Sequence, residues 1–275
     1  MQINLDHTIN SGQVFLWRRL GDLWYGIDGQ NVICAGPSGV RSYRRDGSDF
    51  FRTKDDFAKI SEEISRDGTI RNGVRRFPGL RLLRQDPFQC YISFITSANS
   101  NIQNIRLSLS KIAERFGKKV TFDGIEFHLF PTPDGLAGAS RQELRSCGLG
   151  YRTDYVYDAA RAADSGEVDF AFLKKTDYHT AKSELLKISG IGNKVADCIL
   201  LFSLEKMEAF PLDRWIIRSL QEYYPRRFSF EGKALTDKKY RLLHDELVDY
   251  FGPYAGYSQQ FLFKMIRDSN QKRWV

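Results

Sequence analysis

The pattern of apolar and polar positions changes near Asp86-Pro87. Before that point, over residues 14–45, short apolar or aromatic runs are interrupted by Gly-Asp, Asp-Gly and Gly-Pro-Ser-Gly. Short runs separated by such turn residues are typical of antiparallel strands joined by tight hairpins. We therefore expect a small antiparallel sheet in the first part of the chain, followed by a helix over about 54–66.

Beyond Pro87 the apolar positions recur at helical spacing. Ile102, Ile105 and Leu109 share one face of a helix, and Gly117 is expected to end it. The same periodicity continues almost to the C-terminus. The further helices that it predicts cover 141–147, 154–163, 178–187, 194–204, 214–224, 238–251 and 255–268.

These patterns predict an α+β protein with an antiparallel β domain over 1–85 and helical domains over 86–275. Hydrophobic residues make up 42% of the chain, and 41 Lys and Arg against 34 Asp and Glu give a net charge of +7. This moderate excess suits a polyanionic partner such as nucleic acid without establishing one. The sequence contains neither a long apolar run nor a secretory signal pattern, so we expect no membrane span and a cytoplasmic location.

The cysteines give no sign of a metal centre. Cys34, Cys90, Cys147 and Cys198 are far apart and form no Cys-x-x-Cys pair. Zinc sites and iron–sulfur clusters need clustered ligands, so we expect neither of them and no other cofactor. The cysteines are expected to be small buried apolar residues.

One short stretch, ISGIGNKVADCILLF over 188–202, is a candidate functional site. Gly190 and Gly192 predict a tight connection between two helices, so that 178–204 forms a helix-hairpin-helix. Bare backbone N–H groups at the start of the second helix can hold a phosphate oxygen without reading bases. An ordinary pair of packed helices explains the glycine spacing equally well.

Lys194 and Asp213 favour the functional alternative. A lysine is electrostatically disfavoured at a helix N-terminus, and that field together with partial burial favours a neutral, nucleophilic amine. Pro211 breaks the chain before a new helix, so Asp213 is expected to be its N-cap. Its carboxylate could also stabilise a developing sugar cation or iminium. The alternatives are a solvated lysine and a simple cap.

The stretch LLKISGIGNKVADCI followed by FPLD resembles the helix-hairpin-helix, Gly/Pro…Asp superfamily of base-excision DNA glycosylases. In that superfamily a lysine at this position marks the bifunctional members. Four more stretches narrow the resemblance to the 8-oxoguanine DNA glycosylase/AP lyase family, whose N-terminal domain is a TATA-binding-protein-like sheet. They are SGQVFLW (11–17), DPFQCYISFITSANSNI (86–102), LGYRTDYV (149–156) and FGPYAGYSQQFLF (251–263).

The resemblance implies a role for each residue of a base pocket. Lys194 would attack C1′ to form a Schiff base and permit β-elimination, and Asp213 would stabilise the transition state. The Gly12 carbonyl would accept N7–H of 8-oxoguanine, which guanine lacks. Gln259 and Phe263 share a helix face, where Gln259 would bond the Watson–Crick edge and Phe263 would stack on the base. Cys198 would pack on its other side, although Phe263 alone also reads as a core residue.

The resemblance also implies contacts with the rest of the duplex. Asn99 would fill the hole left by the flipped base, while Tyr151 and Arg152 would wedge its neighbours apart. Gly190 and Gly192 would bring the hairpin to a phosphate. A monovalent ion is implied on the hairpin carbonyls near Leu186, Ile188 and Ile191. Without the resemblance, the wedge residues read as ordinary surface loop residues.

Two positions depart from the eukaryotic pattern. Asn104 stands where eukaryotic members have an arginine that reads the opposite cytosine, and Trp215 stands where they have a phosphate-binding histidine. The departures point to a prokaryotic-type, nucleoid-associated member and leave its opposite-base selection open. The expected partner is double-stranded DNA containing 8-oxoguanine, bound by a monomer. The alternatives are a glycosylase for another damaged purine and a non-catalytic DNA-binding module.

Overall fold

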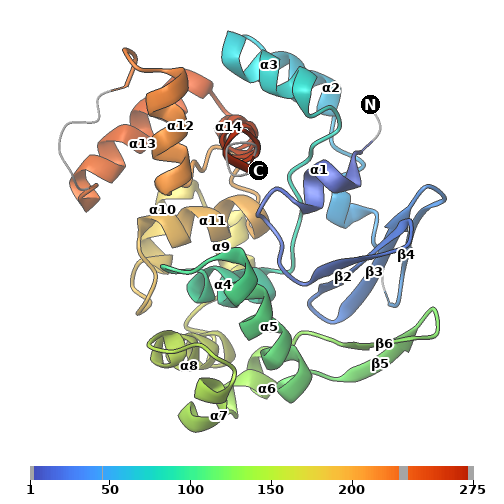
Figure 1. Ribbon diagram of the computed structural model, residues 1–275. Coiled ribbons are helices and arrows are strands. Elements are labelled where there is room, and N and C mark those ends of the chain that lie inside the picture. The colour runs from blue at the N-terminus through green and yellow to red at the C-terminus, as the bar shows by residue number, and fades with distance from the viewer. Residues whose placement is uncertain (1–2, 45, 229–234, 272–275) are drawn as a thin grey trace.

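The computed structural model describes residues 3–44, 46–228 and 235–271. Figure 1 shows the strands on its right-hand side, with most of the helices to their left and the first three above them. The strands β1 (Trp17–Leu20), β2 (Leu23–Asp28), β3 (Asn31–Gly36) and β4 (Gly39–Ser42) form an antiparallel sheet in sequence order. Its register places Tyr25 opposite both Arg18 and Cys34. The structure therefore confirms the expected N-terminal sheet and the α+β class.

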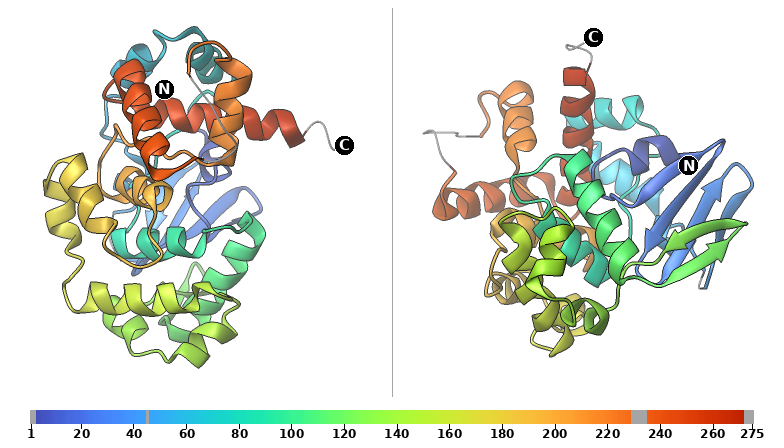
Figure 2. Two further views of the ribbon diagram at one scale, coloured as in Figure 1. Left: turned by 90° about the vertical axis from the view of Figure 1, so that its left-hand side faces the viewer. Right: turned by 60° about the horizontal axis from the view of Figure 1, so that its bottom comes forward.

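A second hairpin lies inside the segment expected to be helical. Strands β5 (Lys119–Phe122) and β6 (Ile125–His128) pair antiparallel through a turn in which Asp123 and Gly124 have φ of 52° and 74°. Positive φ at both positions is the geometry that Asp-Gly favours in a two-residue hairpin. The green hairpin lies beside the blue sheet (Figure 2), where Phe127 stacks on Tyr25 with ring centroids 5.7 Å apart.

The helices expected from periodicity are all present, with ends that differ by a few residues. Four described helices (α1, α3, α6 and α9) were not predicted, because they are short or rich in glycine and polar residues. The helical pattern expected between Pro87 and Gly117 is divided into two helices, 87–96 and 102–116. The helices are α1 (Leu5–Ile9), α2 (Phe57–Ile64), α3 (Gly68–Arg76), α4 (Pro87–Thr96), α5 (Ile102–Phe116), α6 (Pro133–Ala137), α7 (Arg141–Ser146), α8 (Arg152–Asp164), α9 (Phe170–Lys175), α10 (Tyr178–Leu185), α11 (Asn193–Ser203), α12 (Arg214–Tyr223), α13 (Asp237–Phe251) and α14 (Ala255–Gln271), with a 3₁₀ turn η1 (Asp49–Phe51).

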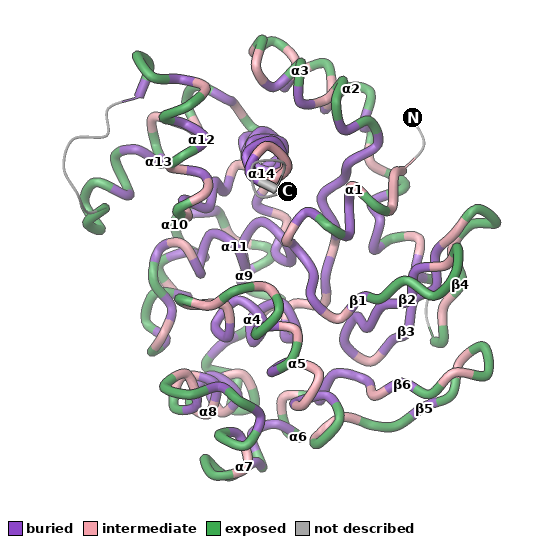
Figure 3. Tube along the Cα trace, viewed as in Figure 1, coloured by how far each residue is buried: buried purple, intermediate pink, exposed green. Residues whose placement is uncertain are grey.

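The helices α4 and α11 form the centre of the core. Nearly every residue of both is buried, and Figure 3 shows buried positions concentrated in these helices, in α14 and in the middle strands. Phe94 of α4 stacks on Phe202 of α11, with ring centroids 5.4 Å apart. Because α11 is enclosed along its length, its N-terminus has a set position. Within the described residues, no helix has both the length and the apolar character needed to cross a membrane.

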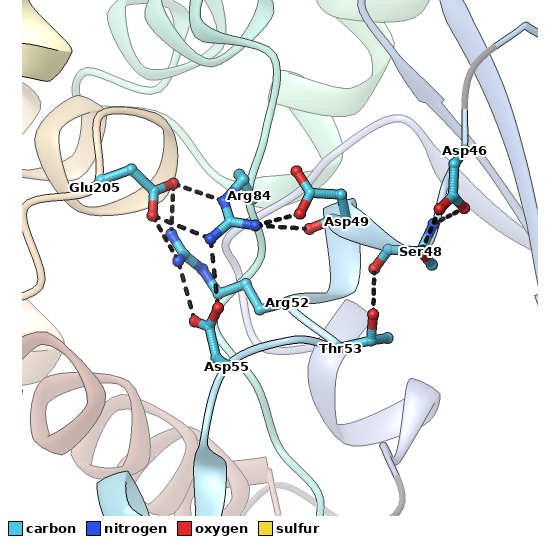
Figure 4. Close-up of polar contacts among 8 residues, drawn as sticks. All are labelled: Asp46, Ser48, Asp49, Arg52, Thr53, Asp55, Arg84 and Glu205. Carbon is cyan, nitrogen blue, oxygen red and sulfur yellow. Dashed lines mark hydrogen bonds and ion pairs between the residues drawn. The ribbon is translucent and has the colours of Figure 1, made fainter.

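A cluster of charged residues joins the N-terminal segment to the end of α11 (Figure 4). The fully buried Arg52 makes two bonds to the Glu205 carboxylate, at 2.7 and 2.9 Å, and Arg84 makes two more, at 2.9 and 3.3 Å. Burial raises the pKa of Glu205, but the bonds and charges of Arg84 and Arg52 outweigh it and lower the pKa overall. The carboxylate therefore stays ionised and binds both arginines.

At two places, residues from the two sides of the proposed division near residue 85 pack against each other. The helix α3 lies against α14, so closely that a β-carbon on Gly73 would be 2.8 Å from Sδ of Met265. The hairpin of β5 and β6, in turn, packs beside the N-terminal sheet. The division into 1–85 and 86–275 stays a prediction.

Candidate active site

A cavity of about 610 Å³ lies where the loop before β1 meets the α4–α5 connection and the helices α11, α12 and α14. Segments from almost the full length of the chain contribute to its wall. The residues predicted to act on the sugar and the base all line it, and they are Gly12, Lys194, Cys198, Asp213, Gln259 and Phe263. The fold thus brings together residues that the sequence offers only as separate motifs.

Lys194 lies in the first turn of α11 and is half-buried. The N-cap of this helix is Gly192, which provides no capping side chain. The Lys194 Nζ donates to Ser97 Oγ at 3.4 Å and lies 5.3 Å from the centre of the Phe94 ring. The amine therefore faces the cavity wall, close to a positive helix end, instead of being surrounded by water.

Asp213 is the N-cap of α12, as predicted. Its Oδ1 accepts hydrogen bonds from the backbone N–H of Trp215 at 2.9 Å and of Ile216 at 2.8 Å. Among the described residues, Oδ2 has no hydrogen-bond partner. One carboxylate can therefore hold the helix with one oxygen and present the other to the cavity.

Cys198 follows Lys194 by one helical turn and is 3% exposed. Burial raises the pKa of its thiol to about 12, against a smaller opposite effect of Lys194. The thiol therefore stays protonated near neutral pH and presents an apolar surface. The Cys198 thiol is therefore not a candidate nucleophile, and the role of Lys194 as the nucleophile stays a prediction.

The loop that carries Gly12 is held on both sides. The buried Gln13 side chain donates to the Arg81 carbonyl at 2.8 Å, and Gln260 of α14 donates to the Ser11 carbonyl at 2.7 Å. Gly12 itself has a φ of 81°, which favours glycine. Within the described part of the chain no donor bonds its carbonyl, which leaves this acceptor for a ligand.

Gln259 and Phe263 face the cavity from one side of α14. Gln259 is 4% exposed, and its Nε2 donates to the Pro211 carbonyl at 3.3 Å. Its Oε1 is buried and has no partner among the described residues. A buried acceptor without a partner is costly, so its position at a cavity points to a ligand that donates to it.

Several polar residues of the cavity were not predicted from the sequence, among them Ser97, Arg267 and Arg214. Ser97 contacts Lys194, as described above, and no local pattern indicated it. Arg267 follows Phe263 by one turn, and its guanidinium lies 5.4 Å from the Trp215 ring and 5.7 Å from the Phe263 ring. Extending the helical spacing from Gln259 and Phe263 would have found it. Arg214, which follows Asp213 in the chain, is exposed and also lines the cavity.

The glycine hairpin has the predicted shape. Gly190 has a φ of 85°, and a β-carbon on it would lie 2.5 Å from Cγ of Tyr155, whereas Gly192 faces open space. The first amides of α11, beginning at Asn193, have no intrahelical acceptor. The Ile188 carbonyl accepts from Ile191 N–H at 3.1 Å. Phosphate binding by this hairpin, and an ion on its carbonyls, stay predictions.

A second cavity of about 630 Å³ adjoins the first, and its wall includes Asn99, Asn104 and Arg152. Asn99 has a φ of 48° and is exposed. Arg152 donates to the carbonyls of Ala98 at 2.5 Å and of Asn99 at 2.9 Å. The Tyr151 hydroxyl donates to the same Ala98 carbonyl at 3.2 Å, and its side chain is among the most exposed large apolar ones. The predicted wedge residues therefore form one group, in which Asn99 and Tyr151 are exposed and Arg152 is half-buried.

No group of three or more His, Cys, Asp or Glu that could hold a metal ion occurs in the described ranges. The four cysteines are all buried and free, as expected. The absence of a catalytic metal stays a prediction.

Comparison with known proteins agrees with this geometry. Residues 92–239 match the family model of the HhH-GPD superfamily base excision DNA repair protein. A probable N-glycosylase/DNA lyase from Methanothermobacter thermautotrophicus is 36% identical over 211 residues, which are 70% of this chain and 64% of that protein's length. The N-glycosylase/DNA lyase OGG1 of Arabidopsis thaliana is 29% identical over 95% of this chain and 77% of its own.

A solved structure is similar over nearly the whole fold. It is the Clostridium acetobutylicum 8-oxoguanine glycosylase/lyase in complex with double-stranded DNA containing cytosine opposite 8-oxoguanine. It has a TM-score of 0.88 and 31% identity, and the match covers 98% of this chain and 93% of that one. Because the family model matches more than half of the 275 residues, and the fold and hairpin agree with it, this chain belongs to the HhH-GPD superfamily of base excision DNA repair proteins.

Proposed function

We propose that this protein is a bifunctional DNA glycosylase that removes 8-oxoguanine from duplex DNA and then cleaves the abasic site. The observation that carries the proposal is the single cavity that holds the Lys194 amine, the Asp213 carboxylate and the base-reading groups of α14. The relatives named N-glycosylase/DNA lyase support both activities, and the Clostridium complex supports the choice of base.

The lesion enters the cavity as a flipped nucleotide. A cavity of about 610 Å³ falls in the range of small-molecule sites, roughly 300–1,000 Å³. Flipped-base pockets combine stacking with hydrogen bonds to the Watson–Crick edge. Here Phe263 provides the stacking ring, Gln259 an acceptor without a protein partner, and Gly12 a carbonyl positioned for N7–H. Guanine lacks that hydrogen and would leave the Gly12 carbonyl unbonded.

The first step replaces the bond to the base by a bond to lysine. The Lys194 amine attacks C1′, and the C1′–N9 bond breaks, so that the base leaves with the electron pair and takes up a proton. Asp213 stabilises the positive charge on the sugar through Oδ2, the oxygen that does not cap the helix. Opening of the ring at the C1′–O4′ bond, with a proton moved from Nζ to O4′, leaves a Schiff base.

The second step cuts the strand. The Schiff base acidifies C2′, which loses a proton, and the C3′–O bond breaks to release the 3′ phosphate. Water then hydrolyses the imine and frees Lys194. The protein groups that take part in these two steps are amino-acid side chains, so the proposed reaction requires no cofactor.

The remaining contacts hold the duplex. The first-turn amides of α11 and the open side of Gly192 bind a phosphate oxygen of the damaged strand. Asn99, held at the tip of its loop by Arg152, fills the space left in the duplex, and Tyr151 wedges the neighbouring base pair. We propose that one monomer binds one double-stranded lesion site.

A panel of duplexes tests the proposal. The duplexes carry 8-oxoguanine, 3-methyladenine, 7-methylguanine or undamaged guanine at one position, and base release and strand cleavage are measured separately. We expect release only of 8-oxoguanine, with strand cleavage following it. Release of a methylated purine in preference would favour a glycosylase for alkylated bases. Binding without release of any base would favour a non-catalytic DNA-binding module.

A further inference from the structure

A group of buried polar side chains lies beneath the hairpin and outside the cavity. The carboxylate of Asp197 is fully buried, and Lys182 Nζ lies 2.9 Å from its Oδ1 and 3.0 Å from its Oδ2. The Tyr178 hydroxyl lies 2.6 Å from Oδ1, and the Tyr240 hydroxyl donates to Oδ2 at 2.6 Å. His244 Nε2 lies 2.8 Å from the Tyr178 hydroxyl. We call these five residues the Asp197 cluster.

The cluster joins three helices and keeps its tyrosines protonated. Lys182 and Tyr178 belong to α10, Asp197 to α11, and Tyr240 and His244 to α13. Burial, and then the charge of Asp197, raise the pKa of Tyr178 and Tyr240, so both keep their protons. Burial lowers the pKa of His244. A buried ion pair of this kind adds little net stability, because the cost of its desolvation offsets its attraction.

Two members of the cluster extend to one short stretch of backbone. The Tyr240 hydroxyl accepts from Leu212 N–H at 3.0 Å, and His244 Nε2 accepts from Phe210 N–H at 3.3 Å. Pro211, between them, has no N–H, and its carbonyl accepts from Gln259. The backbone N–H groups of Phe210 and Leu212 are thus each bonded by a side chain of the cluster.

The segment and the cluster connect the two catalytic groups. Asp213 follows Leu212 directly, and Lys194 precedes Asp197 by three residues on the same helix. The Tyr240 hydroxyl is therefore a one-atom bridge between the helix that carries the amine and the backbone that carries the carboxylate. We infer that Tyr240, with His244 and Asp197, positions Asp213 relative to Lys194 for the proposed reaction, on which this inference rests.

A positioning role predicts an effect on chemistry and not on DNA binding. A displacement of about 1 Å in a catalytic constellation lowers rates by as much as roughly a hundredfold. Phosphate and base contacts lie elsewhere and would persist. The members of the cluster do not line the cavity, so they are positioning residues and not catalytic residues.

Tyr240→Phe is the most conservative test, because it removes only the bridging oxygen. Single-turnover release of 8-oxoguanine should fall at least about tenfold, while affinity for a duplex with an uncleavable abasic analogue changes by less than about threefold. The matched control is Tyr224→Phe, at the far end of α12, which removes a buried hydroxyl that donates to Asp67 at 2.7 Å. The control should lower the melting temperature and leave the rate within about twofold of the parent.

His244→Phe is the second variant. In the parent, the His244 ring is parallel to the Tyr178 ring, with centroids 5.0 Å apart. Phenylalanine keeps an aromatic ring there and removes the acceptor of Phe210 N–H. We expect the same loss of rate with retained binding, and this variant decides the question if Tyr240→Phe does not fold. If the parent protein is active and a folded Tyr240→Phe or His244→Phe variant releases the base within about twofold of the parental rate, the inference is wrong. The proposed function is unaffected by that result. A parent that releases no base overturns the proposed function, and the inference with it.

Discussion

A β-carbon built on Gly12 would lie 2.8 Å from Cε1 of Phe263. Side chains do not approach so closely, so the backbone before β1 and the ring on α14 face each other with no space for a methyl group. Gln260, beside Gln259 on α14, holds the Ser11 carbonyl at 2.7 Å and sets this separation. The carbonyl proposed to read N7–H and the ring proposed to stack on the base are thus parts of one rigid slot.

Gly12→Ala should therefore damage base recognition. The added methyl group displaces Phe263 or the loop, and the φ of 81° disfavours any side chain. We expect kcat/KM on 8-oxoguanine duplex to fall at least about tenfold, or about 1.4 kcal/mol. Gly21→Ala is the matched control, because Gly21 has a φ of 59° with open space around it. It should lose stability but not activity, and an active Gly12→Ala would refute the slot.

Gln259→Leu should separate stability from activity. Leucine removes the buried Oε1, which has no partner among the described residues, and also the long 3.3 Å bond from Nε2 to the Pro211 carbonyl, so the gain offsets the loss. We expect an unchanged or higher melting temperature and a rate of base release lowered by roughly 5- to 150-fold, the value of about 1–3 kcal/mol for a base-edge contact. A variant that is clearly less stable, or fully active, would mean that Gln259 is a structural residue.

The preference for the base opposite the lesion should be weak. Asn104 is short and uncharged, Arg152 is bonded to the carbonyls of Ala98 and Asn99, and Arg106 does not line the second cavity. A bidentate base contact discriminates by about 1–3 kcal/mol. We expect excision opposite cytosine to exceed that opposite the other bases by less than about tenfold in single-turnover assays. A preference of about a hundredfold would mean that another donor replaces the missing arginine, and Arg214, which also lines the second cavity, is a candidate.

Glu205→Gln should weaken the protein in a pH-dependent way. The pKa of Glu205 is lowered in the folded state from its usual 4.5, so the carboxylate stabilises the fold above that pH and ceases to do so as the pH falls below it. We expect a loss of about 2 kcal/mol in free energy of unfolding at pH 7. In urea unfolding, the gap to the parent should narrow below about pH 4.5. Glu63→Gln, in an exposed pair with Arg66, should change little, and a gap independent of pH would contradict this account.

Periodicity and turn residues predicted most of the fold. The helices of the body and the N-terminal sheet follow from local patterns, and the cap at Asp213 follows from Pro211 and the helix after it. The hairpin of β5 and β6 was missed although Asp123-Gly124 is a strong hairpin signal. The alternation covers only the ten residues 119–128, between two segments with helical periodicity.

The site was predictable only in part. The residues of the cavity were named through the family resemblance, because nothing local to Gly12 or Phe263 indicates that they face each other. The Asp197 cluster was not predicted at all. A carboxylate in an apolar helix pattern can be recognised as unusual, but its partners on α10 and α13 lie up to 47 residues away. Only the folded structure brings them together.

The central claim is that Lys194 is the nucleophile, and borohydride trapping tests it most directly. Borohydride reduces a Schiff base between protein and 8-oxoguanine DNA to a stable covalent adduct. Lys194→Gln should form no adduct and release base at least about a thousandfold more slowly, while still binding lesion duplex. Lys118→Gln, which removes an exposed cation beyond the far end of α5, should form the adduct as the parent does. A Lys194→Gln protein that forms the adduct and cuts at near the parental rate would contradict the assignment.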